Sequence, residues 1–160
     1  MRCNVINISI PGKSDYSINN IVFDYNGTLA ENGKISASVR EKLLSLCGMA
    51  DVYVLTADTY GSATGECRGI NLTLKTFPTD NASDCKAQIV DELGRENTVC
   101  FGNGFNDIKM FKSAALSVAV LAGEGMCSAL LISSDVMVRS IEDGMNLLLN
   151  PNALRATLRG

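Results

Sequence analysis

The sequence predicts an α/β fold built on a doubly wound parallel sheet, with a β-hairpin at the N-terminus. From about residue 20 onward, short apolar strands alternate with helical segments, an order typical of parallel sheets. Polar residues directly follow several of these strands, at the edge where such sheets carry their sites. The length of 160 residues fits one domain, residues 1–160, with a single sizeable core.

The composition is that of a globular protein, with 46% hydrophobic and 19% charged residues. The net charge of −3 and the lack of a long basic run argue against nucleic acid as the main partner. The chain has no histidine and no CxxC pair, which argues against a zinc site and against histidine-activated nucleophiles. Scattered cysteines without a signal peptide predict a cytoplasmic protein. No membrane span is expected, because the apolar run 114–123 is too short and is stopped by Glu124.

The first elements are expected to form two hairpins. Alternating isoleucines predict a strand over residues 3–10, and a second strand is expected over 17–24 after the break at Pro11 and Gly12. These two strands are expected to pair at an edge of the sheet. Further on, Asn32-Gly33 is typical of a type I′ turn and predicts a small hairpin flap.

The rest of the chain alternates between predicted strands and predicted helices. Strands are expected over 51–58, 70–74, 98–102, 117–121 and 135–139. Helices are expected over 36–47, 60–67, 81–94, 106–116, near 124–132 and from about 140. The apolar side of the first helix is expected to consist of Val39, Leu43, Leu44 and Leu46.

The residues that follow the strands predict a functional site. Asp24 follows the apolar run IVF and Thr56 follows VYVL, and the segment 102–107, GNGFND, follows TVCF. Lys86 lies early in a helix that should return over the same edge of the sheet. Each residue alone is compatible with a turn former, a helix cap or a solvated lysine. Together at one edge, they predict a single site.

At these residues the chain resembles the haloacid dehalogenase (HAD) superfamily of phosphotransferases. DYNGTL looks like its first motif, DxxGT, and VLTAD looks like its second, a strand that ends in Thr or Ser. DCKAQIVDELG would supply the third-motif lysine, and GNGFNDIKMFKSAALSVAV is similar to the GDGxND segment of P-type ATPase phosphorylation domains. The resemblance runs from about residue 20 to about residue 140 and is closest to small proteins described as soluble P-type ATPase-like.

The resemblance implies phosphoryl transfer through an aspartyl phosphate on Asp24, with Mg²⁺ as cofactor. Asp24 needs no histidine base, because a carboxylate is already ionised at neutral pH. The implied metal ligands are Asp24, the backbone carbonyl of Asn26, Asn103 and Asp107. Thr56 and Lys86 would hold the transferring oxygens. Support for the phosphate and its loop is expected from Gly27, Thr28, Ala57 and Asn106.

Two positions depart from the family pattern. Asn26 stands where phosphatases of the family carry an aspartate that acts as general acid and base, help that is typically worth 10²–10⁴-fold. Slow hydrolysis of the phosphoenzyme is therefore expected. Asn103 replaces an aspartate that usually binds the metal directly, which removes one negative charge from the site.

The intervals between Asp24, Thr56 and Lys86 are filled by predicted core elements, so no cap domain is expected. Such an open site should act on a macromolecular or large phosphorylated substrate, be covered by another subunit of a homo-oligomer, or have little specificity. The sequence does not give the identity of the substrate. Two alternatives remain beside the slow phosphohydrolase. One is a phosphate-binding or partner-binding module without turnover, and the other is a receiver-like phosphoryl acceptor.

Overall fold

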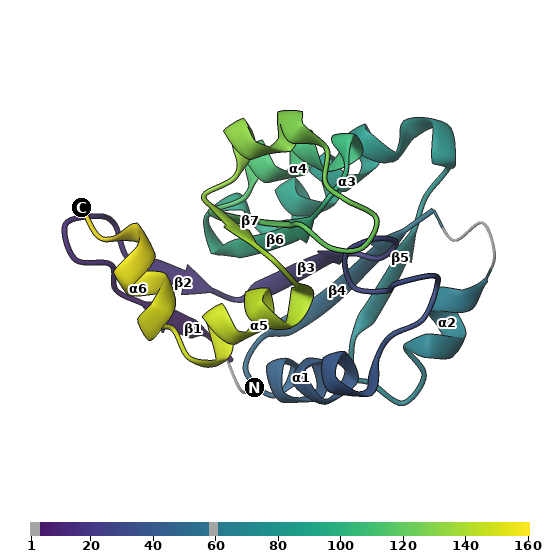
Figure 1. Ribbon diagram of the computed structural model, residues 1–160, viewed down its shortest axis with the longest axis horizontal. Helices are drawn as coiled ribbons and strands as arrows, with labels where there is room; N and C mark the ends of the chain where they lie inside the picture. The colour runs from purple at the N-terminus through teal and green to yellow at the C-terminus, as the bar shows by residue number, and fades with distance from the viewer. Residues whose placement is uncertain (1–3, 58–60) are drawn as a thin grey trace.

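The computed structural model describes residues 4–57 and 61–160, and its centre is a six-stranded parallel sheet (Figure 1). The strands follow the order β5-β4-β3-β6-β7-β8. Their bounds are β3 Asn20–Asp24, β4 Asp51–Thr56, β5 Thr73–Thr76, β6 Thr98–Gly102, β7 Leu116–Val120 and β8 Val136–Val138. All neighbouring pairs are parallel, which confirms the predicted doubly wound α/β fold.

The strand order identifies where a site should form. Counted along the chain from β3, the order is 3-2-1-4-5-6, and the direction of winding reverses between β3 and β6. Ligands of doubly wound sheets bind at that switch point, outside the carboxyl ends of the strands. CheY-like receivers have the order 2-1-3-4-5 instead, so the topology argues against the receiver-like alternative.

Helices cover both faces of the sheet, as Figure 1 shows. On one face α1 (Ala37–Cys47) packs against α5 (Ile141–Leu149), and on the other α3 (Ala82–Leu93) packs against α4 (Ile108–Ser113). Phe23 and Phe101 stack at the centre of the first layer, with ring centroids 4.8 Å apart. All residues of β3 are buried, because helices cover both faces of the sheet. This burial accounts for the apolar run in its sequence, as is usual for a central parallel strand.

The N-terminal hairpin forms, but not where it was expected. β1 (Ile6–Ile8) and β2 (Tyr16–Ile18) pair antiparallel as a separate two-stranded sheet beside α6 (Asn152–Leu158). The predicted strand 17–24 is in fact two strands, interrupted at Asn19. The Asn19 backbone bonds to Asn97 and Asp51, and so directs β3 into the middle of the large sheet instead of along its edge.

The predicted flap is a tight turn. Asn32 and Gly33 both have positive φ angles, 50° and 75°, as a type I′ turn requires. Glu31 and Lys34 exchange two backbone hydrogen bonds of 3.0 and 3.1 Å across this turn. The Tyr25 hydroxyl donates to the Gly33 carbonyl at 3.0 Å, which ties the flap to the end of β3.

Helix α1 begins and ends as predicted. The Ser36 hydroxyl accepts a hydrogen bond from the Val39 amide, and Gly48 ends the helix. Val39, Leu43 and Leu46 are buried, but Leu44 is 50% exposed, so its placement on the apolar side was wrong. Leu44 lies one position, about 100° of helical rotation, away from Leu43 and therefore faces water.

Other boundaries differ from the predictions because local geometry intervenes. The last helix is two helices, α5 and α6, because Pro151 lacks the N–H needed to continue α5. The helix expected near 124–132 is a 3₁₀ segment, Ser128–Ser133. The strand expected at 70–74 is β5, and α4 is preceded by a 3₁₀ turn, Phe105–Asp107. The short helix expected over 60–67 is α2, Ser62–Glu66; residues 58–60 of these predictions lie outside the described residues.

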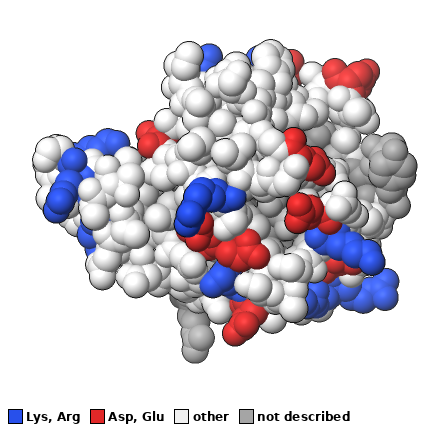
Figure 2. All heavy atoms as spheres, in the orientation of Figure 1, with Lys and Arg blue, Asp and Glu red and all other residues white. Residues whose placement is uncertain are grey.

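No cap domain interrupts the described chain near the site. Between β3 and β4 lie the flap and α1, and between β5 and α3 lies one 3₁₀ turn, Thr79–Asn81. Within residues 4–57 and 61–160, no helix has the length and apolar character needed to cross a membrane. Figure 2 shows lysine and arginine in small groups, interspersed with acidic residues, over the face that it presents.

Candidate active site

A cavity of about 250 Å³ lies at the switch point of the sheet. Asp24 reaches it from the end of β3, Thr56 from the end of β4, and Asn103 from the residue after β6. Its lining consists of Asp24, Asn26, Thr56, Ala57, Phe77, Thr79, Ala82, Lys86, Asn103, Gly104, Asn106 and Glu124. The structure therefore brings residues from all four sequence motifs to one cavity, although the predicted site residues Gly27, Thr28 and Asp107 are not part of this lining.

Lys86 occupies the centre of the buried charge network. Its Nζ lies 2.7 Å from Asp24 Oδ1 and 2.7 Å from Asp107 Oδ1, and it donates to Asn106 Oδ1 at 3.0 Å. These three acceptors satisfy all three protons of the ammonium group. Lys86 is only 2% exposed, so the interactions are shielded from water. When both carboxylates are ionised, they leave the group with a net negative charge against the single ammonium.

The surroundings of Asp24, the candidate nucleophile, shift the pKa of its carboxyl group. Burial raises the pKa of Asp24 to about 7, the Asp107 carboxylate contributes in the same direction, and Lys86 and Thr28 oppose the shift. Burial alone would lower the pKa of Lys86, but the two neighbouring carboxylates outweigh it and raise that pKa. Lys86 therefore stays protonated at neutral pH. A cation beside Asp24 would favour the ionised carboxylate that attack on phosphorus requires.

Asp107 anchors the loop that follows β6. It is fully buried, and its Oδ2 accepts hydrogen bonds from the amides of Asn103 at 3.0 Å and Gly104 at 2.9 Å. A Cβ at Gly102 would lie 2.5 Å from the same oxygen, so glycine is required there. Because Lys86 binds the other oxygen, both oxygens of Asp107 have protein donors. A direct bond from Asp107 to a metal would require one of these donors to be released.

The loop after Asp24 is a compact turn around Gly27. Gly27 has a φ of 75°, and backbone bonds from Thr28 and Ala30 to the Tyr25 carbonyl close the turn. The Thr28 hydroxyl lies 3.2 Å from Asp24 Oδ2 and 3.2 Å from Asn103 Oδ1. Thr28 therefore links the end of β3 to the loop after β6.

The oxygen atoms near Asp24 suit a hard divalent cation. Asp24, Asn26 and Asn103 line the cavity and offer a carboxylate, a backbone carbonyl and an amide oxygen. The lining contains no histidine and no cysteine, and oxygen donors of this kind are those that Mg²⁺ prefers. The net negative charge of the Lys86 network also favours a cation there.

Sequence reasoning missed Glu124. In the sequence it ends an apolar run, and in the structure its side chain lines the cavity with Asp24 and Asn26. Glu124 lies in the loop after β7, at the same edge of the sheet as the other site residues. The rule that located Asp24 and Thr56, a polar residue just beyond a parallel strand, would also have located Glu124.

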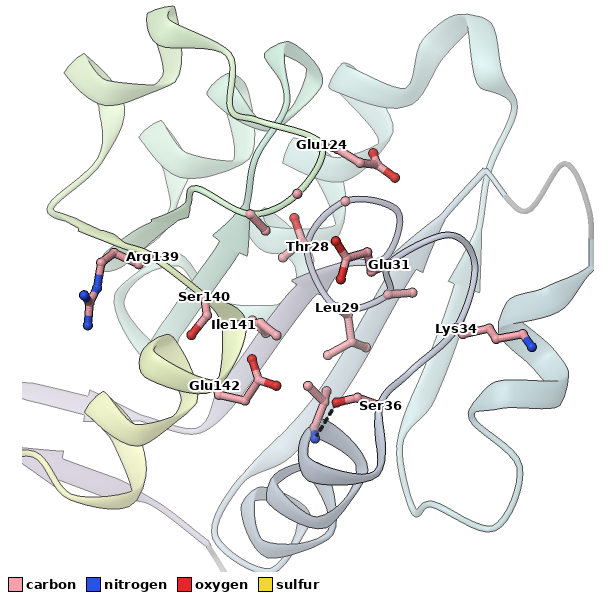
Figure 3. A pocket seen from close by; sticks show the side chains of 15 residues that line it. Thr28, Leu29, Glu31, Lys34, Ser36, Glu124, Arg139, Ser140, Ile141 and Glu142 are labelled. Atoms are coloured by element: carbon pink, nitrogen blue, oxygen red, sulfur yellow. Dashed lines mark hydrogen bonds between the residues drawn. The ribbon is translucent and has the colours of Figure 1, made fainter.

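A second cavity, of about 240 Å³, lies beside the first (Figure 3). The flap and the residue range 27–31 form one wall, and the start of α5 forms another. Its charged lining residues are Glu31, Lys34, Glu124, Arg139 and Glu142. Glu124 thus borders both cavities.

Comparison with known proteins identifies a family and two relatives that this sequence resembles. Residues 89–143, which include the loop after β6, match the family of haloacid dehalogenase-like hydrolases. An uncharacterized protein of Methanocaldococcus jannaschii is 42% identical over 78 residues, which cover 46% of this chain and 84% of that protein. A second uncharacterized protein of the same organism is 49% identical over 39 residues, 24% of this chain and 89% of that protein.

Solved structures share the fold. The 3-deoxy-D-manno-octulosonate 8-phosphate phosphatase of Moraxella catarrhalis, in complex with magnesium ion, phosphate ion and its sugar acid, superimposes with a TM-score of 0.69. The match covers 89% of this chain and 94% of that one at 14% identity. A cobalt-bound phosphatase of Haemophilus influenzae also gives 0.69, at 12% identity and the same coverage. The likeness to P-type ATPase phosphorylation domains stays a prediction. By its match over residues 89–143 and by its fold, the chain is similar to the haloacid dehalogenase-like hydrolases.

Proposed function

We propose that the protein is a Mg²⁺-dependent phosphohydrolase or phosphotransferase that forms an aspartyl phosphate on Asp24 and hydrolyses it slowly. The observation that carries this proposal is the Asp24 carboxylate, which ends β3 inside a cavity and lies 2.7 Å from the buried ammonium of Lys86. A carboxylate in contact with a fixed cation, beside further oxygen donors, is suited to attack on an anionic phosphate.

In the first step an Asp24 oxygen attacks phosphorus, the bond to the leaving oxygen breaks, and the leaving group departs with its electron pair. Lys86 and Thr56 would stabilise the transferring phosphoryl oxygens, since both line the cavity with Asp24. When bound, Mg²⁺ would offset the repulsion between the carboxylate and the phosphate. Asp24, Asn103 and the Asn26 carbonyl would hold it, and Asp107 would position Lys86 and the loop.

In the second step water must attack the phosphoenzyme, and Asn26 is the reason to expect this step to be slow. Asn26 is exposed at the cavity, where an aspartate could accept a proton from water. An amide can donate a hydrogen bond but cannot take up that proton. Loss of general base help typically costs 10²–10⁴-fold.

The test is incubation with acetyl phosphate or para-nitrophenyl phosphate and Mg²⁺, followed by assays for released phosphate and for acid-stable phosphoprotein. We expect a phosphoprotein that turns over slowly, and neither signal from the Asp24→Ala variant. Absence of both signals in the wild-type chain would overturn the proposal. A panel of phosphorylated substrates should include 3-deoxy-D-manno-octulosonate 8-phosphate, the substrate named for the structural neighbours.

A second candidate function is a phosphate-binding or partner-binding module without turnover. Asparagine at both position 26 and position 103 favours it, since both residues line the cavity. The double variant Asn26→Asp, Asn103→Asp separates the two functions. A rate gain over a measurable wild-type activity supports the enzyme, whereas activity that appears only in the variant supports the binding module.

A further inference from the structure

Glu124 lies at a fixed place beside the proposed metal site. It occupies the tip of the turn Ala122–Gly125, which is closed by a 2.8 Å bond from the Gly125 amide to the Ala122 carbonyl. Figure 3 shows Glu124 on a loop next to the segment that carries Thr28 and Glu31. The loop is therefore a defined turn at the mouth of the cavity.

Two hydrogen bonds tie this turn to Asn103. The Asn103 side-chain amide donates to the Gly125 carbonyl at 3.2 Å, and the Cys127 amide donates to the Asn103 carbonyl at 2.8 Å. Asn103 is the residue that stands where the resemblance expects an acidic metal ligand. The position of Glu124 is thus coupled directly to that residue.

Glu124 and Asn103 also meet at Gly27. A Cβ built on Gly27 would lie 2.6 Å from Glu124 Oε2 and 2.5 Å from Asn103 Nδ2. The Glu124 carboxylate therefore lies beside Gly27, and Glu124 lines the same cavity as Asp24. Among the residues that the structure describes, Glu124 forms no ion pair, so no described cation neutralises its charge.

We infer that Glu124 supplies the cation site with the negative charge that Asn103 lacks. The inference rests on the proposed Mg²⁺ site and deepens it. Asp24 and Asp107 already share one counter-charge, Lys86, and Glu124 brings a further carboxylate to the lining of the cavity that Asp24 enters. Residues around a metal site that orient or complement its ligands typically change metal affinity by 10–100-fold when replaced.

The experiment is a calorimetric titration of the full chain with Mg²⁺, in the wild type and in the variants Glu124→Gln and Glu142→Gln. Glu142 is the matched control because it lines the second cavity but not the active-site cavity. We expect Glu124→Gln to weaken Mg²⁺ binding by about 10–100-fold and Glu142→Gln to leave it nearly unchanged. Circular dichroism during heating checks that both variants are folded.

A rescue variant makes the test specific. Adding Asn103→Asp to Glu124→Gln should restore most of the lost affinity, because it returns a carboxylate to the same space. Equal Mg²⁺ affinity in the wild type and in Glu124→Gln would overturn this inference and leave the proposed function standing. If the wild type bound no Mg²⁺ at all, both would be overturned.

Discussion

The two sides of the cavity differ in burial and in charge. On one side Asp24, Lys86 and Asp107 form a buried network in which the ammonium group has all its acceptors. On the other side Asn26, Asn103 and Glu124 lie at the open mouth, and two of these positions carry an amide where the family pattern has an acid. Under the proposed mechanism, the first side supplies the groups that phosphoryl capture would use, and the second lacks the acids that would serve hydrolysis and direct metal binding. The contrast predicts that the two half-reactions respond to different residues.

The largest effect is expected from Asp24→Ala, which removes the proposed nucleophile. Phosphoprotein formation should fall below detection, a loss of at least about 10⁴-fold, because the variant lacks the carboxylate proposed to carry the phosphoryl group. Acid-quench labelling with acetyl phosphate measures it. Asp84→Ala is the control, because Asp84 is an exposed carboxylate on the same helix as Lys86. Labelling that persists in Asp24→Ala would place the acceptor elsewhere and break the comparison.

Asn26→Asp tests the open side. It should speed phosphoenzyme hydrolysis by about 10²–10⁴-fold while the rate of phosphoprotein formation changes much less, because a carboxylate can take a proton from water. Single-turnover decay of labelled protein separates the two steps. Equal acceleration of both steps would show that Asn26 also limits the rate of phosphoprotein formation. Since Asn26 precedes Gly27, samples should be checked by mass for deamidation to aspartate.

Asp107→Asn tests the buried side through stability. It removes a partner of Lys86 and weakens the bonds to the Asn103 and Gly104 amides, at a cost of about 3 kcal/mol or more. The melting temperature should fall by about 6–12 °C. Asp91→Asn, which alters an exposed pair with Arg95, should leave it nearly unchanged. Equal stability of the two variants would contradict a structural role for Asp107.

The smallest effect is expected from Gly27→Ala compared with Gly61→Ala. Both glycines have similar positive φ angles, 75° and 69°, so backbone strain costs each variant about 1 kcal/mol. Only at Gly27 would the new methyl group meet Asn103 and Glu124; at Gly61 nothing lies within 4 Å. Gly27→Ala should therefore also weaken Mg²⁺ binding, measured by calorimetry. Equal Mg²⁺ affinity in the two variants would show that the space beside Gly27 is unimportant for metal binding.

Local patterns in the sequence were sufficient to predict the sheet and the edge at which Asp24, Thr56 and Lys86 lie together. β6 lies where TVCFG predicts it, and α1 runs from the Ser36 cap to Gly48, since strand runs and helix caps are determined by nearby residues. Asp24, Thr56 and Lys86 meet at one cavity because parallel strands end at the same edge. These features depend on chemistry within a few residues of each position.

The tertiary structure decided what depends on contacts between distant segments. The N-terminal hairpin leaves the sheet because Asn19 bonds to Asn97, far along the chain. Leu44 faces water because neighbouring layers contact α1 on only part of its surface. Asp107 lies behind Lys86, and Glu124 reaches the mouth of the cavity, because loops after different strands converge there. Sequence position places these residues beyond strand ends, but packing in three dimensions decides which of them meet and which are buried.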